Sequence, residues 1–242
     1  MITFTIPGTA LPRLARLALA ADTDGPGPLR HVALRVTSTA VRFSATNGKL
    51  LASVILDISD LKGDIGDFTE SILDCAQFTA ACKAIGKHCH KPVTISIEKT
   101  EARITFGTVS SLVRRHESMV YPAHDHIWTR SAGLLWVPCT SSLDPALAAT
   151  AQKIAGTTRM LFRTPVQPAS GLPRLWEAAT EDETAPALSD LRNLVRAPAY
   201  WISDEQEMAI LLMPISRADA EQQLDFSRFA CPMTGSQVSA AA

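Results

Sequence analysis

The sequence repeats one order of secondary structure, and this repeat restricts the possible folds more than any other feature. Residues 2–6 alternate apolar and polar side chains, which predicts a short strand. Residues 10–21 then follow a helical period, and alternating apolar residues between 32 and 58 predict three strands, two of them joined by the turn signal Asn47-Gly48. The first copy of the pattern is therefore a strand, a helix and three strands.

A second copy begins at Ile72 and Leu73, which predict a short strand. Residues 74–87 have the period of a helix, residues 93–106 alternate as a hairpin about a polar turn, and residues 109–114 predict a further strand. The order of the first copy is thus repeated.

A third copy begins with a strand at residues 134–137. Asp144 and Pro145 predict the start of a helix, because Asp caps free N–H groups and proline has none to leave unpaired. Met160 and Phe162 predict a return to strand character, and residues 200–213 close the copy with two strands about a polar turn.

Corresponding apolar positions of the three helices support an internal repeat: Leu14, Phe78 and Leu147 are 64 and 69 residues apart. The sequence predicts an α+β fold of repeated units, each with a short helix on an antiparallel sheet. Four segments fall outside the repeat. They are a polar connection (59–69), a Pro-rich loop (165–173), an acidic insertion (181–198) and a flexible tail (217–242).

Each predicted helix has an apolar face and a smaller basic face. In the first helix Leu14 and Ala18 belong to the apolar face, and Ala20 is expected opposite. A basic helix face is ordinarily a solvated one, but its recurrence on three helices also suits a surface that faces phosphates. The basic residues of these faces are Arg13, Arg16, Lys83, Lys87 and Lys153.

The charge of the chain limits the kind of nucleic-acid contact. Residues 1–180 hold 19 Lys and Arg against 14 Asp and Glu, a balance of +5, and residues 181–242 hold 4 against 10, a balance of −6. A protein that coats a duplex is normally more basic. Any contact with nucleic acid is therefore expected to be local, sparse or geometric.

The motifs of common enzyme classes are missing from the sequence. There is no P-loop, G-x-G-x-x-G, G-x-S-x-G or H-E-x-x-H, so we expect no enzyme, no catalytic residue and no cofactor. Five cysteines without a C-x-x-C pair indicate reduced thiols. His88, Cys89 and His90 with Cys82 are an alternative zinc site, but ligands this close together diverge, and we expect no bound metal.

The stretch Phe-Ser-Ala-Thr-Asn-Gly-Lys-Leu-Leu-Ala, from Phe43 to Ala52, resembles a family signature. It is similar to Ala-Thr-Asp-Gly-His-Arg-Leu-Ala in the central domain of the bacterial DNA polymerase III beta subunit, the sliding clamp. Asn47, Lys49 and Leu50 depart from that signature. The resemblance covers residues 1 to about 216.

Three further stretches resemble sliding clamps in the same order along the chain. They are the hairpin 93–107, Tyr121-Pro122 in place of the Phe-Pro that precedes a domain linker, and residues 211–215 in place of a C-terminal Met-Pro-Met. The resemblance implies a DNA-clamp fold, in which helices line the inside of a ring and sheets form its outer shell.

The resemblance also implies a division into domains. Residues 1–128 are similar to the central clamp domain. Residues 129–216 are similar to the C-terminal domain, which would be either partial or interrupted by the insertion 181–198. Residues 217–242 form the tail. Family rings contain twelve units, so four units in this chain would give a trimer. Three units would give another ring or none.

A family clamp binds polymerase and clamp-loader peptides in an apolar cleft between domains. In such a clamp we expect the basic residues given above to face DNA, because they lie on the polar faces of their helices. The alternative for the cleft positions is plain sheet core. Leu50 and Ser216 replace basic residues of the family, so peptide preference is expected to differ. The cleft positions are Thr46, Gly48, Leu51, Pro122, His126, Ile127, Leu211, Met213, Pro214 and Ile215.

The function that we predict is a processivity factor for DNA replication, a homo-oligomer that encircles double-stranded DNA without sequence preference and tethers the polymerase. With no apolar run of about 20 residues and no signal peptide, we expect a cytoplasmic protein without a membrane partner. A non-ring adaptor that binds replication proteins is the alternative, and a metal-dependent enzyme using residues 88–90 is a weaker one. Residues 223–226 loosely resemble a clamp-binding peptide, so the tail is a candidate occupant of the cleft.

Overall fold

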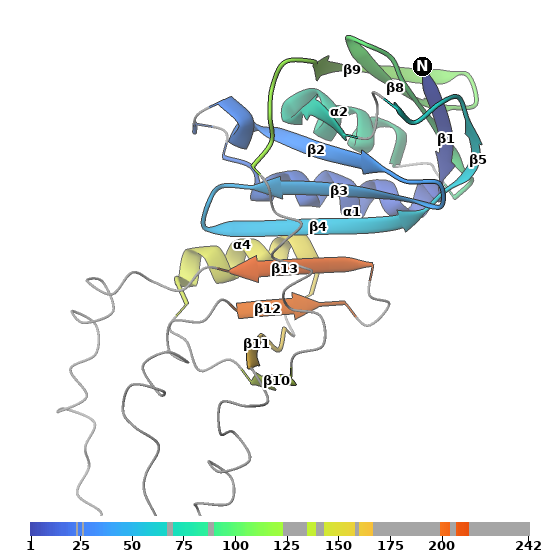
Figure 1. Cartoon of the computed structure of the whole chain (residues 1–242). Helices are drawn as coiled ribbons and strands as arrows, with labels where there is room; N and C mark the ends of the chain where they lie inside the picture. The colour runs from blue at the N-terminus through green and yellow to red at the C-terminus, as the bar shows by residue number, and fades with distance from the viewer. Residues whose placement is uncertain are drawn as a thin grey trace, which may run out of the picture.

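The structure is a computed structural model of the chain, and its described strands form antiparallel pairs in one sheet. The α-helices α1 (Leu11–Leu17), α2 (Cys75–Gly86) and α4 (Pro145–Ala155) lie on one face of that sheet (Figure 1). The described residues are 1–22, 24–25, 27–66, 70–86, 90–122, 135–138, 143–157, 160–166, 199–203 and 207–212.

The first unit consists of a strand, the helix α1 and four strands. Two 3-10 turns, Gly8–Ala10 and Ala18–Ala20, flank α1, and a third, Gly27–Arg30, leads back into the sheet. The strands are β1 (Ile2–Ile6), β2 (His31–Val36), β3 (Ala40–Thr46), β4 (Leu50–Asp57) and β5 (Ser59–Lys62).

The second and third units repeat the order of a strand, a helix and three strands. The second unit contains β6 (Glu70–Asp74), α2, β7 (Val93–Ile97), β8 (Glu101–Phe106) and β9 (Val109–His116). The third contains β10 (Leu135–Pro138), α4, β11 (Arg163–Val166), β12 (Ala199–Ile202) and β13 (Met208–Leu212). The predicted fold of repeated helix-on-sheet units is confirmed.

The first two units exchange their opening strands. β1 lies between β7 of the second unit and β5 of its own unit, and β6 lies between β2 of the first unit and β9 of its own unit. By this connectivity β1, β2, β3 and β4 correspond to β6, β7, β8 and β9. Neither unit completes its sheet without the other, so we treat residues 1–122 together as the paired units.

The third unit extends the same sheet at the edge of β4. β13 pairs with β4 from Met208 opposite Val54 to Leu212 opposite Leu50. The strand order of the whole sheet is β10-β11-β12-β13-β4-β3-β2-β6-β9-β8-β7-β1-β5. We call residues 135–212, in their described parts, the third unit.

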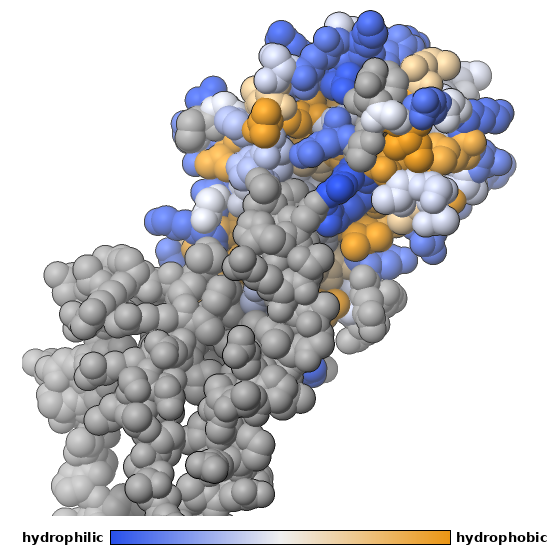
Figure 2. All heavy atoms as spheres, in the orientation of Figure 1, coloured by the Kyte–Doolittle hydropathy of each residue, from blue (hydrophilic) through white to orange (hydrophobic). Residues whose placement is uncertain are grey.

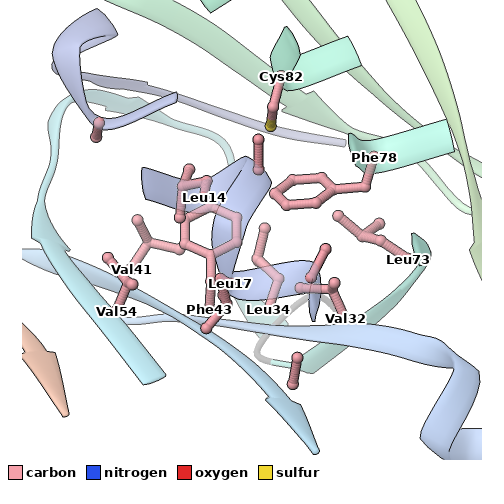
Figure 3. Packing of buried hydrophobic residues seen from close by; sticks show 14 of the residues in the cluster. Leu14, Leu17, Val32, Leu34, Val41, Phe43, Val54, Leu73, Phe78 and Cys82 are labelled. Atoms are coloured by element: carbon pink, nitrogen blue, oxygen red, sulfur yellow. The ribbon is translucent and has the colours of Figure 1, made fainter. Parts of the chain in front are cut away.

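The core lies between the helices and the sheet (Figure 3). Phe43 from β3 and Phe78 from α2 stack with ring centroids 5.6 Å apart, beside Leu14 and Leu17 of α1. Each fully buried side chain of this size stabilises the fold by about 1.5–3 kcal/mol relative to exposure. On the face of the paired units seen in Figure 2, small apolar patches lie among hydrophilic residues.

Three details differ from the sequence prediction. Ala20 is fully buried, because the helix ends in a 3-10 turn whose step of about 120° per residue moves Ala20 away from the expected polar side. β5 lies in the expected connection 59–69, where an edge strand needs no alternating apolar residues. Met160 and Phe162 precede the strand β11 and pack against the core.

Candidate nucleic-acid and peptide interfaces

The predicted DNA-facing residues lie on the helices, and the two arginines of α1 contact the third unit. The Arg13 guanidinium forms an ion pair with Glu207, which precedes β13. Both side chains remain partly exposed, at 28% and 45%. Arg13 therefore links α1 to the third unit and retains some contact with solvent.

Arg16 caps the C-terminal end of α4. Its Nε donates a hydrogen bond to the Ile154 carbonyl oxygen over 3.2 Å, which satisfies an acceptor that the end of a helix leaves free. Gly156 ends α4 with a φ of 72°, and a Cβ at this position would lie 3.0 Å from the Arg16 guanidinium. Glycine thus allows both the left-handed helix end and the approach of Arg16.

The lysines of the other helices are open to solvent. Lys83 on α2 and Lys153 on α4 are exposed, and Lys87 lies outside the described residues. Between α1 and α2 there is a groove of about 510 Å³, lined in part by Ala15, Leu19 and Lys83. Cations beside this groove can contact phosphates without reading base sequence.

The turn between β3 and β4 is built by its own side chains. Asn47 Oδ1 accepts hydrogen bonds from the backbone N–H groups of Lys49 and Leu50 at 2.9 and 2.7 Å, and Gly48 takes a φ of 85°. Thr46 Oγ1 donates to the Leu50 carbonyl oxygen at 2.8 Å. The hydroxyl of Thr46 is therefore engaged in a hydrogen bond within the turn. Gly48 is exposed at the tip of the turn.

Leu51 and Leu211 of the predicted cleft are neighbours across β4 and β13. Tyr200 of β12 lies opposite Leu211 in the next strand, and the three side chains form a small apolar cluster separate from the main core. Because Leu50 and Ala52 point into the core, strand alternation places Leu51 on the face opposite the helices. Leu51 and Leu211 are only 4% and 3% exposed, so their side chains are not open walls of a groove.

Tyr121 brings a distant segment to the same part of the sheet. Its hydroxyl donates to the Ser44 carbonyl oxygen over 3.4 Å, and its ring packs with Ala33 and Ile72 on the face opposite the helices. Burial raises the pKa of the Tyr121 phenol, and a hydrogen bond to the Thr46 backbone only partly opposes this effect. The hydroxyl of Tyr121 therefore reaches β3, and the adjacent Pro122 is exposed.

The described members of the predicted cleft come from three separate segments that meet around β3, β4 and β13. They are the β3–β4 turn with Leu51, the segment ending at Pro122, and Leu211. His126, Ile127, Met213, Pro214 and Ile215 lie outside the described residues, as do His88 and Cys89 of the alternative zinc site and the tail. Sequence analysis missed Tyr200, whose aromatic ring in a strand gave no sign that it faces away from the core.

No family model matches the sequence, and no curated protein matches it. Solved structures do match. A DNA polymerase III beta subunit from Eubacterium rectale aligns with a TM-score of 0.57 and 10% identity, over 88% of this chain and 65% of its own. The beta subunit of Thermotoga maritima aligns with a TM-score of 0.53 and 8% identity, over 89% of this chain and 65% of its own. The sliding clamp of Pseudomonas aeruginosa aligns with a TM-score of 0.54 and 16% identity, over 89% of this chain and 67% of its own.

The chain has the sliding-clamp fold. It spans about two thirds of the length of these clamps. The resemblance seen in the sequence is confirmed at the level of fold. None of the described helices is long and apolar enough to cross a membrane.

Proposed function

We propose that the protein is a clamp-like processivity factor for DNA replication, a non-enzymatic role in which it encircles duplex DNA and tethers a polymerase. One observation carries the proposal most strongly. α1 contacts both α2 and α4, so helices of all three units form one layer on one face of a continuous sheet. A continuous layer of helices on one face suits the inner surface of a ring around DNA.

The DNA-facing surface is the helix layer. Lys83 and Lys153 supply exposed charge, and Arg13 and Arg16 add partly exposed guanidinium groups next to the junction with the third unit. This sparse set suits a surface that slides past phosphates, because a dense basic surface would hold them. Affinity for DNA falls as salt rises, so the slope of log affinity against log salt is negative. The double variant Lys83→Ala with Lys153→Ala should make this slope less steep by about 1 or more.

The matched control for this variant removes two exposed lysines from elsewhere, with Lys62→Ala and Lys99→Ala. Its net charge is the same, so an equal loss of DNA affinity in both variants would contradict the assignment of the helix face. Arg13 and Arg16 are left intact because their substitution would also disturb the third unit.

An open strand edge supports assembly with further copies of the chain. β9 holds the place in the second unit that β4 holds in the first, since each is paired with the preceding strand of its own unit. The other edge of β4 pairs with β13. In the part of the chain that the structure describes, no strand occupies the matching edge of β9 at residues 109–112. Val109 and Leu112 there are each 52% exposed. We assign this edge to the contact that continues the sheet into the next copy.

Light scattering on the purified chain at micromolar concentration tests the assembly. We expect a defined oligomer, and the variant Val109→Lys with Leu112→Lys should dissociate it. The control Val120→Lys with Leu161→Lys changes two other exposed apolar residues and should leave it intact. A monomeric wild-type chain would contradict the ring.

The peptide-binding cleft is proposed beside the cluster of Leu51, Tyr200 and Leu211, where the exposed Gly48 and Pro122 mark its edge. The domain division 1–128 and 129–216 places this cleft between a two-unit domain and a partial one. A non-ring adaptor is the second candidate, because three units are described and the chain spans about two thirds of the clamps. The adaptor would bind replication peptides as a monomer.

A further inference from the structure

Three groups able to bind a metal ion meet where β2, β6 and β9 lie side by side. His31 begins β2, Asp74 ends β6 opposite His31, and His116 ends β9 opposite Ile72 of β6. One potential ligand atom from each residue lies within 4.8 Å of the other two. The two imidazole rings have centroids 4.3 Å apart, tilted by 41°.

Two ring nitrogens of this cluster are buried without a hydrogen-bond partner among the described residues. They are Nδ1 of His31 and Nε2 of His116. His31 is only 8% exposed, so water does not readily reach it. An unpaired buried polar atom is unfavourable, and such atoms are rare in folded proteins. A cation bound by these two nitrogens would satisfy both.

The carboxylate of Asp74 is held by the first turn of α2. Asp74 Oδ1 accepts the backbone N–H of Gln77 over 2.9 Å at the start of α2. This hydrogen bond orients the carboxylate, as second-shell contacts commonly do for metal ligands.

We propose that His31, Asp74 and His116 bind one zinc ion, with water in the fourth position. Two imidazoles and a carboxylate are an established donor set for Zn²⁺. Bonds of about 2.0–2.1 Å in a tetrahedral site place ligand atoms about 3.3 Å apart, so binding draws the three groups together by about 1.5 Å at most. Asp74 and His116 are half-buried, so both side chains retain some exposure to solvent.

The ion would join β2 of the first unit to β6 and β9 of the second, beside a short strand pairing. β6 and β9 pair, among the described residues, at Ile72 with His116 and at Leu73 with Arg115. β6 pairs more extensively with β2, from Glu70 to Asp74. A zinc ion held by β2, β6 and β9 would therefore stabilise the closure of the sheet. This inference does not depend on the proposed ring or on DNA binding.

Calorimetric titration of the full, EDTA-treated chain with ZnCl₂ tests the site. We expect one ion per chain, and Asp74→Asn and His116→Ala should each weaken it by more than about tenfold. Asp74→Asn is the informative variant, because asparagine keeps an oxygen that can accept the Gln77 N–H and cap α2. Zn²⁺ at a fixed concentration just sufficient to saturate the wild type should raise the Tm of the wild type, and should raise that of Asp74→Asn by less.

The control is the triple variant His88→Ala, Cys89→Ser, His90→Ala, which removes the alternative ligands near the end of α2 and should bind zinc like the wild type. Co²⁺ in place of zinc should give a visible spectrum without a thiolate charge-transfer band. Failure of the wild type to bind zinc, unchanged affinity in Asp74→Asn and His116→Ala, or loss of binding in the triple variant would overturn the proposal.

Discussion

The paired units and the third unit complete their sheets in different ways. In the paired units, β1 and β6 are exchanged, so each unit closes the sheet of the other. In the third unit, β10 pairs with β11 of the same unit, and β13 joins β4 of the first unit. Arg13 and Arg16 reinforce that junction. The third unit therefore depends on the first, whereas the paired units depend on their shared core.

The largest effect should come from the shared core. Phe78→Ala removes a fully buried ring that stacks on Phe43, and we expect a loss of about 3–5 kcal/mol in the free energy of unfolding. Urea unfolding of the full chain measures this loss. Phe106→Ala is the matched control, since Phe106 is only half-buried and should cost less. Equal losses in the two variants would contradict the proposed core.

A smaller and local effect should follow Gly156→Ala. Alanine at a φ of 72° is strained by about 1–2 kcal/mol, and its Cβ would displace the Arg16 guanidinium from the end of α4. We expect faster hydrogen exchange in α4, with little change in α2. Gly107→Ala is the control, because its φ is 57° and no atom lies within 4 Å of an added Cβ. If Gly156→Ala and Gly107→Ala lowered the free energy of unfolding equally, the contact of Arg16 with the end of α4 would contribute nothing to stability.

The smallest expected effect is on the alkylation rate of Cys82, which shows whether the paired units open independently of the third unit. Burial raises the pKa of the Cys82 thiol to about 12, so at pH 8 only about one molecule in 10⁴ carries the reactive thiolate. Alkylation of Cys82 by iodoacetamide, followed by peptide mass spectrometry, should be slow in the wild type and unchanged by Gly156→Ala. Phe78→Ala should accelerate it. Acceleration by Gly156→Ala would show that the two regions open together.

Side-chain periodicity in the sequence was sufficient to predict most of the fold. β1 and α2 are half-buried elements, and burial of one face produces the periods of 2 and about 3.6 that identify them. β5 is an exposed edge strand held by β1, so no such period marks it. Ala20 was misplaced because a helical period does not show where a helix tightens into a 3-10 turn.

The candidate sites could be predicted only in part. Resemblance to sliding clamps indicated that Leu51, Pro122 and Leu211 belong to one region, and the described structure brings their segments together. The contacts of Arg16 could not be predicted, because a basic residue on a polar helix face has the same pattern whether it faces solvent or another helix end. The cluster of His31 and His116 depends on the exchange of β6, which no local pattern encodes.

Encirclement of DNA by the chain can be tested without a loading factor, by trapping the protein on end-blocked DNA. The protein is allowed to thread onto linear duplex carrying a biotin at each end, streptavidin then blocks the ends of one half of the sample, and both halves are washed at high salt. Encirclement predicts retention on blocked DNA and loss from open DNA, since sliding off needs a free end. Equal retention on both would contradict encirclement.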